Sequence, residues 1–518
     1  MIGGLMKTTS RFAVMAAASL LATTGVMAAD LGGNCCADLE ERVAELEATT
    51  ARKGNRKVSL TVYGQVNEAV LWWDDGEESN AYVVTNENSR TRFGFRGDAK
   101  LSAEWSAGFL LEIGVRIANS AAVSQLVDDN TTSTQSLDLR HSAWYLDSTR
   151  LGRMWVGHTS MATDGITEIN LSNAGTFAGP DINNFNGGFF LRAKNGQLLA
   201  VAPTSSPTTG VSPVGLTWAG ISSQANANVG DGDRRNLVRY ISPVFWGFTF
   251  SASWGEDDFW DTALRYANEW NGFRFAGGIG YQKWTDGDAF SRLPQFLGSG
   301  TTNLVATGSQ NDRGCADLSF LTFHDGSDVD CGALGLSWSA MHVPTGLYVA
   351  ASYGILKDDN RRELFRVSTG GVIDNAKDKD QFWYVQAGVE RNWLGIGKST
   401  FYGEYFRGDT GAGLSGGNVR NLGVFLPPPT VGPGDTFTND LWISKSEVDM
   451  WGLGFVQSID AAAMDLYIGF RQYKADVTGV ARTQIFEEPG ELEESNTRRR
   501  KFSLENFNAV MAGGLIRF

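Results

Sequence analysis

Arginines at alternate positions of one short segment are the residues in this sequence best suited to interact with charged solutes. The segment 89–97 carries Arg90, Arg92 and Arg96. Phe93 and Phe95 lie between the last two arginines. Because successive side chains of a β-strand point to opposite faces, a lipid contact for the phenylalanines would turn the arginines toward water. Polar faces of later segments with the same period carry Arg140, Arg235, Arg239 and Arg265.

Acidic residues that could oppose these arginines lie in a long polar connection at about 159–233. They are Asp164, Glu168 and Asp181, and nearby glycine and proline residues would let the connection fold back. Opposite charges across a narrow water-filled passage create a field that orders water and orients dipolar solutes. We therefore predict a charged constriction in which the arginines face Asp164 and Glu168. Two alternatives are open: the connection is an ordinary solvated loop, or the arginines only hold the wall together through ion pairs.

The residue types and motifs of the sequence give little support for an enzyme active site. The chain has 4 histidines, and His141 is followed directly by Ser142. On a strand these two side chains would point to opposite faces, so they could not act as base and nucleophile. The sequence contains no H-E-x-x-H or phosphate-binding-loop motif. We expect no enzyme activity, no metal and no cofactor; a hydrolase barrel using dispersed carboxylates and a structural adhesin barrel are the alternatives.

Period-two alternation supplies the elements that would position these residues. It is clearest at 101–116, where Trp105, Phe109, Leu111 and Ile113 alternate with polar or small residues. Further stretches lie at about 58–72, 89–101, 136–147, 150–158, 234–242, 247–255, 259–269, 273–284, 333–342, 347–356, 381–392, 399–407, 446–459, 464–474 and 505–518. The fold class is all-β: we predict a transmembrane antiparallel β-barrel of about 16 strands, with 14 or 18 as alternatives, wide enough for a water-filled channel.

The connections between these stretches are of two kinds, which orients the barrel. Short turns, such as those at 148–150, 271–272 and 344–346, alternate with long polar loops. The long loops lie at about 74–88, 117–135, 159–233, 285–332, 357–380, 408–445 and 475–504. In outer-membrane barrels the short turns face the periplasm and the long loops face outside. The longest loop follows the fifth strand, and we predict that it folds inward.

Both ends of the chain indicate export to an outer membrane. Lys7 and Arg11 precede an apolar stretch at 12–21 and small residues near 26–29, which predicts a secretory signal peptide over 1–29. At the other end Phe518 closes an alternating strand in which Ile516 and the alternate residues before it are apolar or small. Such an end is typical of the strand that delivers a barrel to its assembly machinery. We therefore expect a barrel in the outer membrane of a Gram-negative bacterium, in contact with lipid and lipopolysaccharide.

Composition and charge suit this prediction. The chain has 62 glycines, 16 tryptophans and only 12 prolines, as expected for one large sheet with half-apolar strands. A formal net charge of -14 speaks against nucleic acid as a partner.

Cysteines and a short apolar repeat mark the remaining features. Cys315 and Cys331 share one predicted outer loop, where an oxidising compartment would allow a disulfide stabilising the fold by about 3 kcal/mol in the loop-closure model. The segment 30–56 would be periplasmic and precede the barrel, 57–518. In it Leu39, Val43 and Leu46 have coiled-coil spacing, which predicts either a three-helix contact between copies or a helix lying on the barrel rim. Adjacent Cys35 and Cys36 would be strained as a pair; bridging between subunits is an alternative.

The sequence resembles the alphaproteobacterial, rhizobial-type outer-membrane porins. The resemblance is carried by the stretches 35–47 and 57–60, the arginine segment 89–97, the loop start 162–166, the segment 240–243 and the terminal Phe518. It covers essentially the whole mature chain and weakens at about 290–330 and 408–445. It implies a sixteen-stranded barrel, usually a homotrimer, that passes small hydrophilic solutes by passive diffusion. A barrel with substrate-specific transport is the alternative within this class.

Overall fold

The computed structural model describes residues 58–128, 137–201, 214–222, 228–255, 258–285, 330–362, 377–410, 436–487 and 491–518. The predicted signal peptide, the predicted helix at 30–56 and Cys35, Cys36 and Cys315 lie outside these residues. Two compact units divide at Leu60 and Thr61, and the second unit, Thr61–Phe518, contains the sheet.

Nearly all regular structure of the described residues is β-strand. The strands are β1 (Thr61–Asp74), β2 (Ser79–Thr85), β3 (Arg92–Lys100), β4 (Trp105–Val115), β5 (Leu137–Ser148), β6 (Gly152–Ser160), β7 (Ala200–Val201), β8 (Val214–Gly215), β9 (Arg234–Ile241), β10 (Phe248–Gly255), β11 (Trp260–Trp270), β12 (Phe273–Trp284), β13 (Cys331–His342), β14 (Leu347–Asp358), β15 (Lys379–Arg391), β16 (Ser399–Thr410), β17 (Thr436–Ile459), β18 (Met464–Glu487), β19 (Glu491–Phe502) and β20 (Phe507–Arg517). The short helices are η2 (Glu87–Ser89), η3 (Asn173–Thr176), η4 (Ile182–Asn184), α2 (Trp218–Ser222) and η7 (Asp460–Ala462). Among the described residues no helix has the length and hydropathy of a membrane span.

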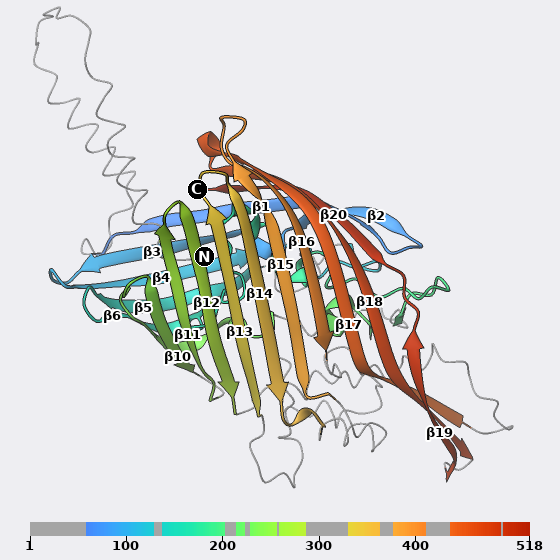
Figure 1. Cartoon of the computed structure of the whole chain (residues 1–518). Coiled ribbons are helices and arrows are strands. Elements are labelled where there is room, and N and C mark those ends of the chain that lie inside the picture. Colours follow the sequence, from blue (N-terminus) through green and yellow to red (C-terminus); the bar gives the residue numbers. More distant parts are fainter. Residues whose placement is uncertain are drawn as a thin grey trace, which may run out of the picture. The chain divides into compact units, whose positions relative to one another are not determined.

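The sheet closes on itself as an antiparallel barrel of 16 strands, which confirms the predicted fold class. Closure occurs where β1 pairs with β20, from Gln65 opposite Arg517 to Asp74 opposite Asn508. β2 and β3 pair with successive parts of β1, and β19 and β20 pair with successive parts of β18, so each of these two pairs fills one strand position. Figure 1 shows the strands side by side, with short turns at the end where the C-terminus lies.

The predicted strand positions agree with the structure, but some predicted loops are partly strand. β2 lies within the stretch expected to be a loop at 74–88, and β18 and β19 occupy most of 475–504. β17 also begins at Thr436, ten residues before the predicted start at 446. These parts carry polar residues on both faces, so the apolar alternation that lipid imposes on the other strands is missing from them.

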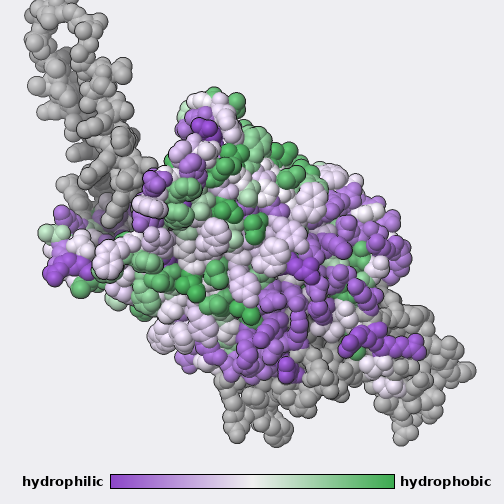
Figure 2. All heavy atoms as spheres, viewed as in Figure 1, coloured by the Kyte–Doolittle hydropathy of each residue, from purple (hydrophilic) through white to green (hydrophobic). Residues whose placement is uncertain are grey.

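Burial along the strands follows the lipid and lumen faces. On β1, Val66 and Val70 are exposed on the outer surface, whereas Ala69 and Leu71 between and beyond them are buried inside. Exposed apolar side chains therefore gather on the outside of the barrel. Figure 2 shows them across the strands, with hydrophilic residues concentrated toward the end from which the long connections emerge.

The long connection after β6 enters the barrel and packs against one side of its inner wall. Its Phe177 stacks on Tyr467 at 4.2 Å between ring centroids, and its Phe189 lies 4.8 Å from Phe507. Arg471 donates to the Gly179 carbonyl at 3.0 Å. These contacts form a continuous apolar core between this inward loop and strands β13–β20 and β1. The predicted inward fold of this loop is therefore present, and the polar cavity left in the lumen is lined by residues of β3, β5, β6 and β9.

Candidate functional site

An inward turn between β2 and β3 brings two charged residues into the lumen. The chain leaves the barrel wall after Thr85 and rejoins it at Arg92, with η2 in between. Asn86 starts this turn by accepting a hydrogen bond from the Asn88 backbone N–H at 3.0 Å. Two inward side chains of β1 hold it: Gln65 donates to the Ser89 carbonyl at 2.7 Å, and Asn67 donates to the same carbonyl at 2.9 Å. Glu87 and Arg90 thereby become part of the lumen wall.

A β-bulge in β5 turns two consecutive side chains inward. Glu112 of β4 pairs with His141, but the next residue, Ile113, pairs with Leu139, so Arg140 is the extra residue. Bulges of this kind re-aim side chains that would otherwise alternate. Arg140 bonds inward-facing Glu112, and His141 lies 3.1 Å from Thr159 Oγ1.

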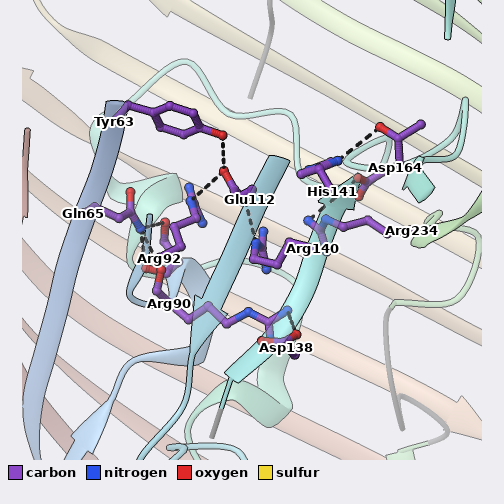
Figure 3. Close-up of polar contacts among 12 residues, drawn as sticks. Tyr63, Gln65, Arg90, Arg92, Glu112, Asp138, Arg140, His141, Asp164 and Arg234 are labelled. Carbon is purple, nitrogen blue, oxygen red and sulfur yellow. Dashed lines mark hydrogen bonds and ion pairs between the residues drawn. The ribbon is translucent and has the colours of Figure 1, made fainter. Parts of the chain in front are cut away.

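The arginines of this wall are paired with acids of the same wall. Glu112 accepts from Arg140 Nε at 2.7 Å and from the Tyr63 hydroxyl at 2.8 Å, and lies 3.8 Å from Arg92 Nε. Figure 3 shows these partners converging on Glu112 from three neighbouring strands. Because Glu112 holds both arginines, their guanidinium groups have fixed positions.

A second cluster of ion pairs lies on the extracellular side of Glu112. Arg90 contacts Glu87 at 3.2 Å and Asp138 at 2.9 Å. Arg116 shares both partners, at 2.9 Å from Glu87 and 3.8 Å from Asp138. The wall formed by β3, β4, β5 and the inward turn is therefore a mosaic of both charges rather than a purely positive surface.

The inward loop supplies the opposite wall with carboxylates. Asp231 accepts from the backbone N–H of Gly165 at 2.7 Å and from that of Thr167 at 2.8 Å, which fixes the loop around Glu168. Asp164 lies 3.9 Å from Arg234, at the start of β9. These contacts place the loop acids opposite the arginine wall.

Burial and mutual repulsion shift the protonation of the loop acids. Burial, together with the charge of Asp231, raises the pKa of Glu168, and burial raises the pKa of Asp181 to about 7. Burial also acts on Asp164, but the Arg234 charge and a hydrogen bond from Ser160 outweigh it and lower the pKa of Asp164 to about 2. The loop wall therefore holds one permanent carboxylate and others that gain protons near neutral pH.

Between the two walls lies a cavity of about 500 Å³. Its charged lining includes five arginines and seven acids: Arg90, Arg92, Arg116, Arg140, Arg234, Glu87, Asp138, Asp164, Glu168, Asp181, Asp231 and Asp233. Such a polar passage can hydrate and orient small charged or dipolar solutes. Among the described residues no group of three or more His, Cys, Asp or Glu side chains is placed to hold a metal ion.

The structure brings together five of the nine residues predicted for the constriction. Arg90, Arg92, Arg140, Asp164 and Glu168 all line the cavity. The other four lie outside its lining.

Those four arginines have other contacts. Arg96 lies 5.8 Å from the Tyr63 ring centroid, and Arg235 lies 5.6 Å from that of Phe259. Arg239 donates to the Met161 carbonyl at 3.1 Å, and Arg265 donates to the Asp164 carbonyl at 2.7 Å. Arg239 and Arg265 thus hold the start of the inward loop through hydrogen bonds to its backbone carbonyls.

Several cavity residues were missing from the predicted constriction. Glu87, Asp138, Asp231 and Arg234 lie in stretches without strand alternation or at strand starts, so face counting could not assign them. One signal was available: the dense charge run at 231–234, just before β9, marks the point where the inward loop meets the wall.

The predicted assembly residues lie at the barrel seam, and Cys331 begins β13. The Phe518 backbone N–H donates to the Gly64 carbonyl at 3.1 Å, and the Gly64 N–H donates back at 3.0 Å. A side chain at Gly64 would collide with the Phe518 ring, so glycine makes room for it. Ile516 is exposed on the outer surface. Cys331 is disulfide-bonded, and pairing with Cys315 stays a prediction.

Comparison with known proteins gives one broad match. A family model of Gram-negative porins matches residues 16–487. No curated protein sequence matches the chain.

Solved structures resemble the chain only distantly. An anion-selective porin from Comamonas acidovorans is 14% identical, with 89% of this chain and 100% of that chain covered and a TM-score of 0.45. OmpF of Salmonella typhi, in complex with daunomycin, is 11% identical. The match covers 89% of this chain and 98% of OmpF, with a TM-score of 0.43. OprB of Pseudomonas putida is 11% identical. The match covers 93% of this chain and 97% of OprB, with a TM-score of 0.43. Similarities this low carry no functional argument.

Proposed function

The chain belongs to the family of Gram-negative porins, and from this premise we propose that the cavity between the arginine wall and the inward loop is the constriction of its channel. As a porin it lies in the outer membrane and forms a water-filled channel for passive diffusion. The observation that carries the proposal is the placement of Arg90, Arg92 and Arg140 on one side of the cavity and Asp164 and Glu168 on the other. Small hydrophilic solutes and ions pass between them.

The balance of charges suggests a direction of selectivity. The cavity lining has more acids than arginines, and several arginines are neutralised by acids of their own wall. We propose that the channel prefers cations weakly at neutral pH and more strongly as the loop acids lose their protons.

Chemical modification of a cavity residue tests whether this cavity is the narrowest point. Ala122 lines the cavity, so Ala122→Cys adds a thiol there with little change in volume. Reaction with a bulky water-soluble thiol reagent should lower single-channel conductance at least about twofold if the cavity limits the current. The matched control is Ser106→Cys, near the periplasmic end of β4, where modification should change conductance little. Equal block at both positions, or block only at Ser106, would place the constriction elsewhere.

Processing, assembly and origin are separate proposals. We propose a homotrimer of the alphaproteobacterial type, with residues 1–29 removed on export, 30–56 as a periplasmic segment and 57–518 as the barrel. Insertion would use the barrel-assembly machinery, with lipopolysaccharide around the outer rim. Cross-linking of the native outer membrane and the mass of the mature chain test these points.

We propose that the protein is not an enzyme. The stretch 413–417 has the G-x-S-x-G spacing of a nucleophile elbow, but this spacing is meaningful only between a strand and a helix, and the stretch lies outside the described residues. Purified protein should therefore give ohmic steps in a planar bilayer without ester or peptide hydrolysis, and Ser415→Ala should alter neither result. Hydrolysis that is lost in Ser415→Ala would refute the proposal.

A further inference from the structure

Tyr145, Arg153 and Trp155 form a stack on the lumen side of β5 and β6, close to the short turn that joins these two strands. Tyr145 and Trp155 lie directly opposite each other across the strand pair. The adjacent residues Trp144 and Met154 are exposed on the outer surface. Because successive side chains of a strand point to opposite faces, the stack lies inside the barrel.

The stack fixes the position of the Arg153 guanidinium. Its Cζ atom lies 4.3 Å from the Tyr145 ring centroid and 5.7 Å from that of Trp155. Tyr145 lies flat against β4, because a Cβ atom at Gly108 would fall 2.4 Å from the ring carbon that bears its hydroxyl. Asp147 accepts from Arg153 Nε at 3.1 Å. The two terminal nitrogens of Arg153 donate no hydrogen bond to any residue that the structure describes.

Two further donors beside Arg153 have no acceptor. Trp155 is buried, and its indole Nε1 has no hydrogen-bond partner within the described part of the chain. Arg239 of β9 lies opposite Trp155, and its Nε is likewise buried without a partner there, although its Nη1 holds the Met161 carbonyl. Arg153 pairs with Ile241, so Arg153 and Arg239 are diagonal neighbours, a placement that long side chains can bridge. Buried donors are rarely left without an acceptor, which indicates that something else occupies this place.

The donors around this place fit a small carboxylate. An arginine offers parallel N–H bonds that match the two oxygens of a carboxylate or a phosphate. Two acids lie nearby: Asp147 bonds Arg153, and Asp98 accepts from the Tyr145 hydroxyl. Because Coulomb energy is proportional to charge, these acids repel a doubly charged phosphate about twice as strongly as a singly charged carboxylate. The surroundings therefore favour the carboxylate.

We propose that Arg153, Trp155 and Arg239 form a binding site for the carboxylate group of small organic acids at the periplasmic end of the lumen. None of these three residues lines the constriction cavity. A solute from the periplasm reaches the site without crossing that cavity, so the site is independent of the ion preference proposed above. Organic acids that enter or leave the channel pause here.

Fluorine NMR with trifluoroacetate tests the site in the purified protein. A small anion bound to the barrel relaxes faster than the free anion, so the protein should broaden its fluorine line, and excess acetate should reverse this broadening. In Arg153→Gln the reversible broadening should fall at least about threefold, because a charged hydrogen-bond donor is lost. Trp155→Phe keeps an aromatic ring but loses the N–H, and should lower it about twofold.

The matched control is Arg150→Gln, which removes a cation from the exposed turn at the same end of the barrel. It should leave the broadening unchanged. Equal broadening by the unaltered protein and Arg153→Gln would overturn the proposal, as would equal losses in Arg153→Gln and Arg150→Gln, which would show only a general attraction of anions to positive charge.

Two further comparisons separate the remaining readings. Acetate should displace trifluoroacetate at a lower concentration than phosphate does, and the reverse order would overturn the assignment to carboxylates. Trp155→Phe leaves the Arg153 ion pair with Asp147 in place, so it decides the question even if Arg153→Gln folds poorly; broadening unchanged in Trp155→Phe would contradict the role of the indole. No step of this test uses conductance or selectivity, so its result and that for the constriction are independent.

Discussion

Glu112 is the residue that most directly controls the charge of the arginine wall. It bonds Arg140 and Tyr63 and faces Arg92 from the adjoining strand, while being only 7% exposed. Charge-assisted bonds of this kind are stronger than neutral ones and fix geometry as well as charge. Glu112 therefore both neutralises and positions the two arginines that it contacts.

Replacing Glu112 tests this role. In Glu112→Gln the shape is kept but the negative charge is lost, so the cation-to-anion permeability ratio should fall. In water, the interaction energy between a unit charge and a monovalent ion about 10 Å away is about 0.4 kcal/mol. This energy corresponds to about a twofold change in the permeability ratio. The reversal potential under a salt gradient measures it. Glu447→Gln, on the outer surface where Glu447 pairs with Arg407, is the control and should leave the ratio unchanged.

Protonation of the inward loop predicts a pH dependence of selectivity. The pKa of Asp181 is raised to about 7 and that of Glu168 is also raised, both chiefly by burial. Below these values the acids are neutral and above them they are charged, so the cation preference should grow from pH 5 to pH 9. Reversal potentials at several pH values check this. Asp181→Asn should remove part of the change near pH 7; an unaltered pH profile in that variant would show that Asp181 does not act on the permeating ions.

At the scale of the elements, the strands follow from the sequence because lipid enforces an alternation of side chains. β12 was predicted residue for residue, and the segment containing Trp105 and Ile113 was recognised by its period. The inward turn holding Glu87 and the bulge at Arg140 were not predicted. Their positions depend on side-chain bonds from Gln65 and on the register between β4 and β5, neither of which leaves a periodic pattern.

The last strand is the element that closes the barrel, and Phe518 makes its final contacts. Removing Phe518 deletes two backbone hydrogen bonds with Gly64 and the ring packed over it. An unpaired strand edge is prone to wrong association, so we expect slower insertion and a lower amount of protein in the outer membrane. Quantitative blotting of membrane fractions measures this, with Phe518→Tyr as a variant that keeps the aromatic ring and the backbone. Normal levels after deletion would contradict an assembly role for the terminal residue.

The inward loop is an element that the wall holds at many points, and the buried Arg471 is one of them. It bonds Glu404 through Nε at 2.7 Å and through a second nitrogen at 2.9 Å, and also holds the Gly179 carbonyl. Removing one partner of a buried ion pair lowers the free energy of unfolding by about 3–5 kcal/mol, because the other charge stays buried and unpaired. In Arg471→Met the loop should loosen, giving a noisier and larger current.

Combining this change with Glu404→Gln provides the matched control. The double variant leaves no unpaired buried charge, so it should recover stability but not the loop contact at Gly179. Thermal unfolding followed by gel mobility and single-channel noise measure the two effects separately. A quiet, unchanged current in Arg471→Met would mean that other contacts alone fix the loop.

At the scale of the whole molecule, the barrel lumen is asymmetric. The inward loop and its apolar core occupy the side of β13–β20 and β1, and the polar cavity is lined by residues of β3, β5, β6 and β9. The predicted barrel of about sixteen strands and its inward loop are therefore present. Which side the loop fills could not be predicted, because it depends on contacts such as Phe177 with Tyr467 and Phe189 with Phe507 between residues far apart in the chain.

The reversal potentials of two variants with opposite charge changes test the central claim most directly. One variant combines Arg90→Gln, Arg92→Gln and Arg140→Gln, and the other combines Asp164→Asn with Glu168→Gln. If these groups form the constriction, the first should shift permeability toward cations and the second toward anions, with both shifts fading as salt shortens the screening length from about 10 Å at 0.1 M. Arg96→Gln, outside the cavity, is the control and should shift little. Shifts of equal sign in the two variants, or none in either, would contradict the placement of the constriction between the arginine wall and the inward loop.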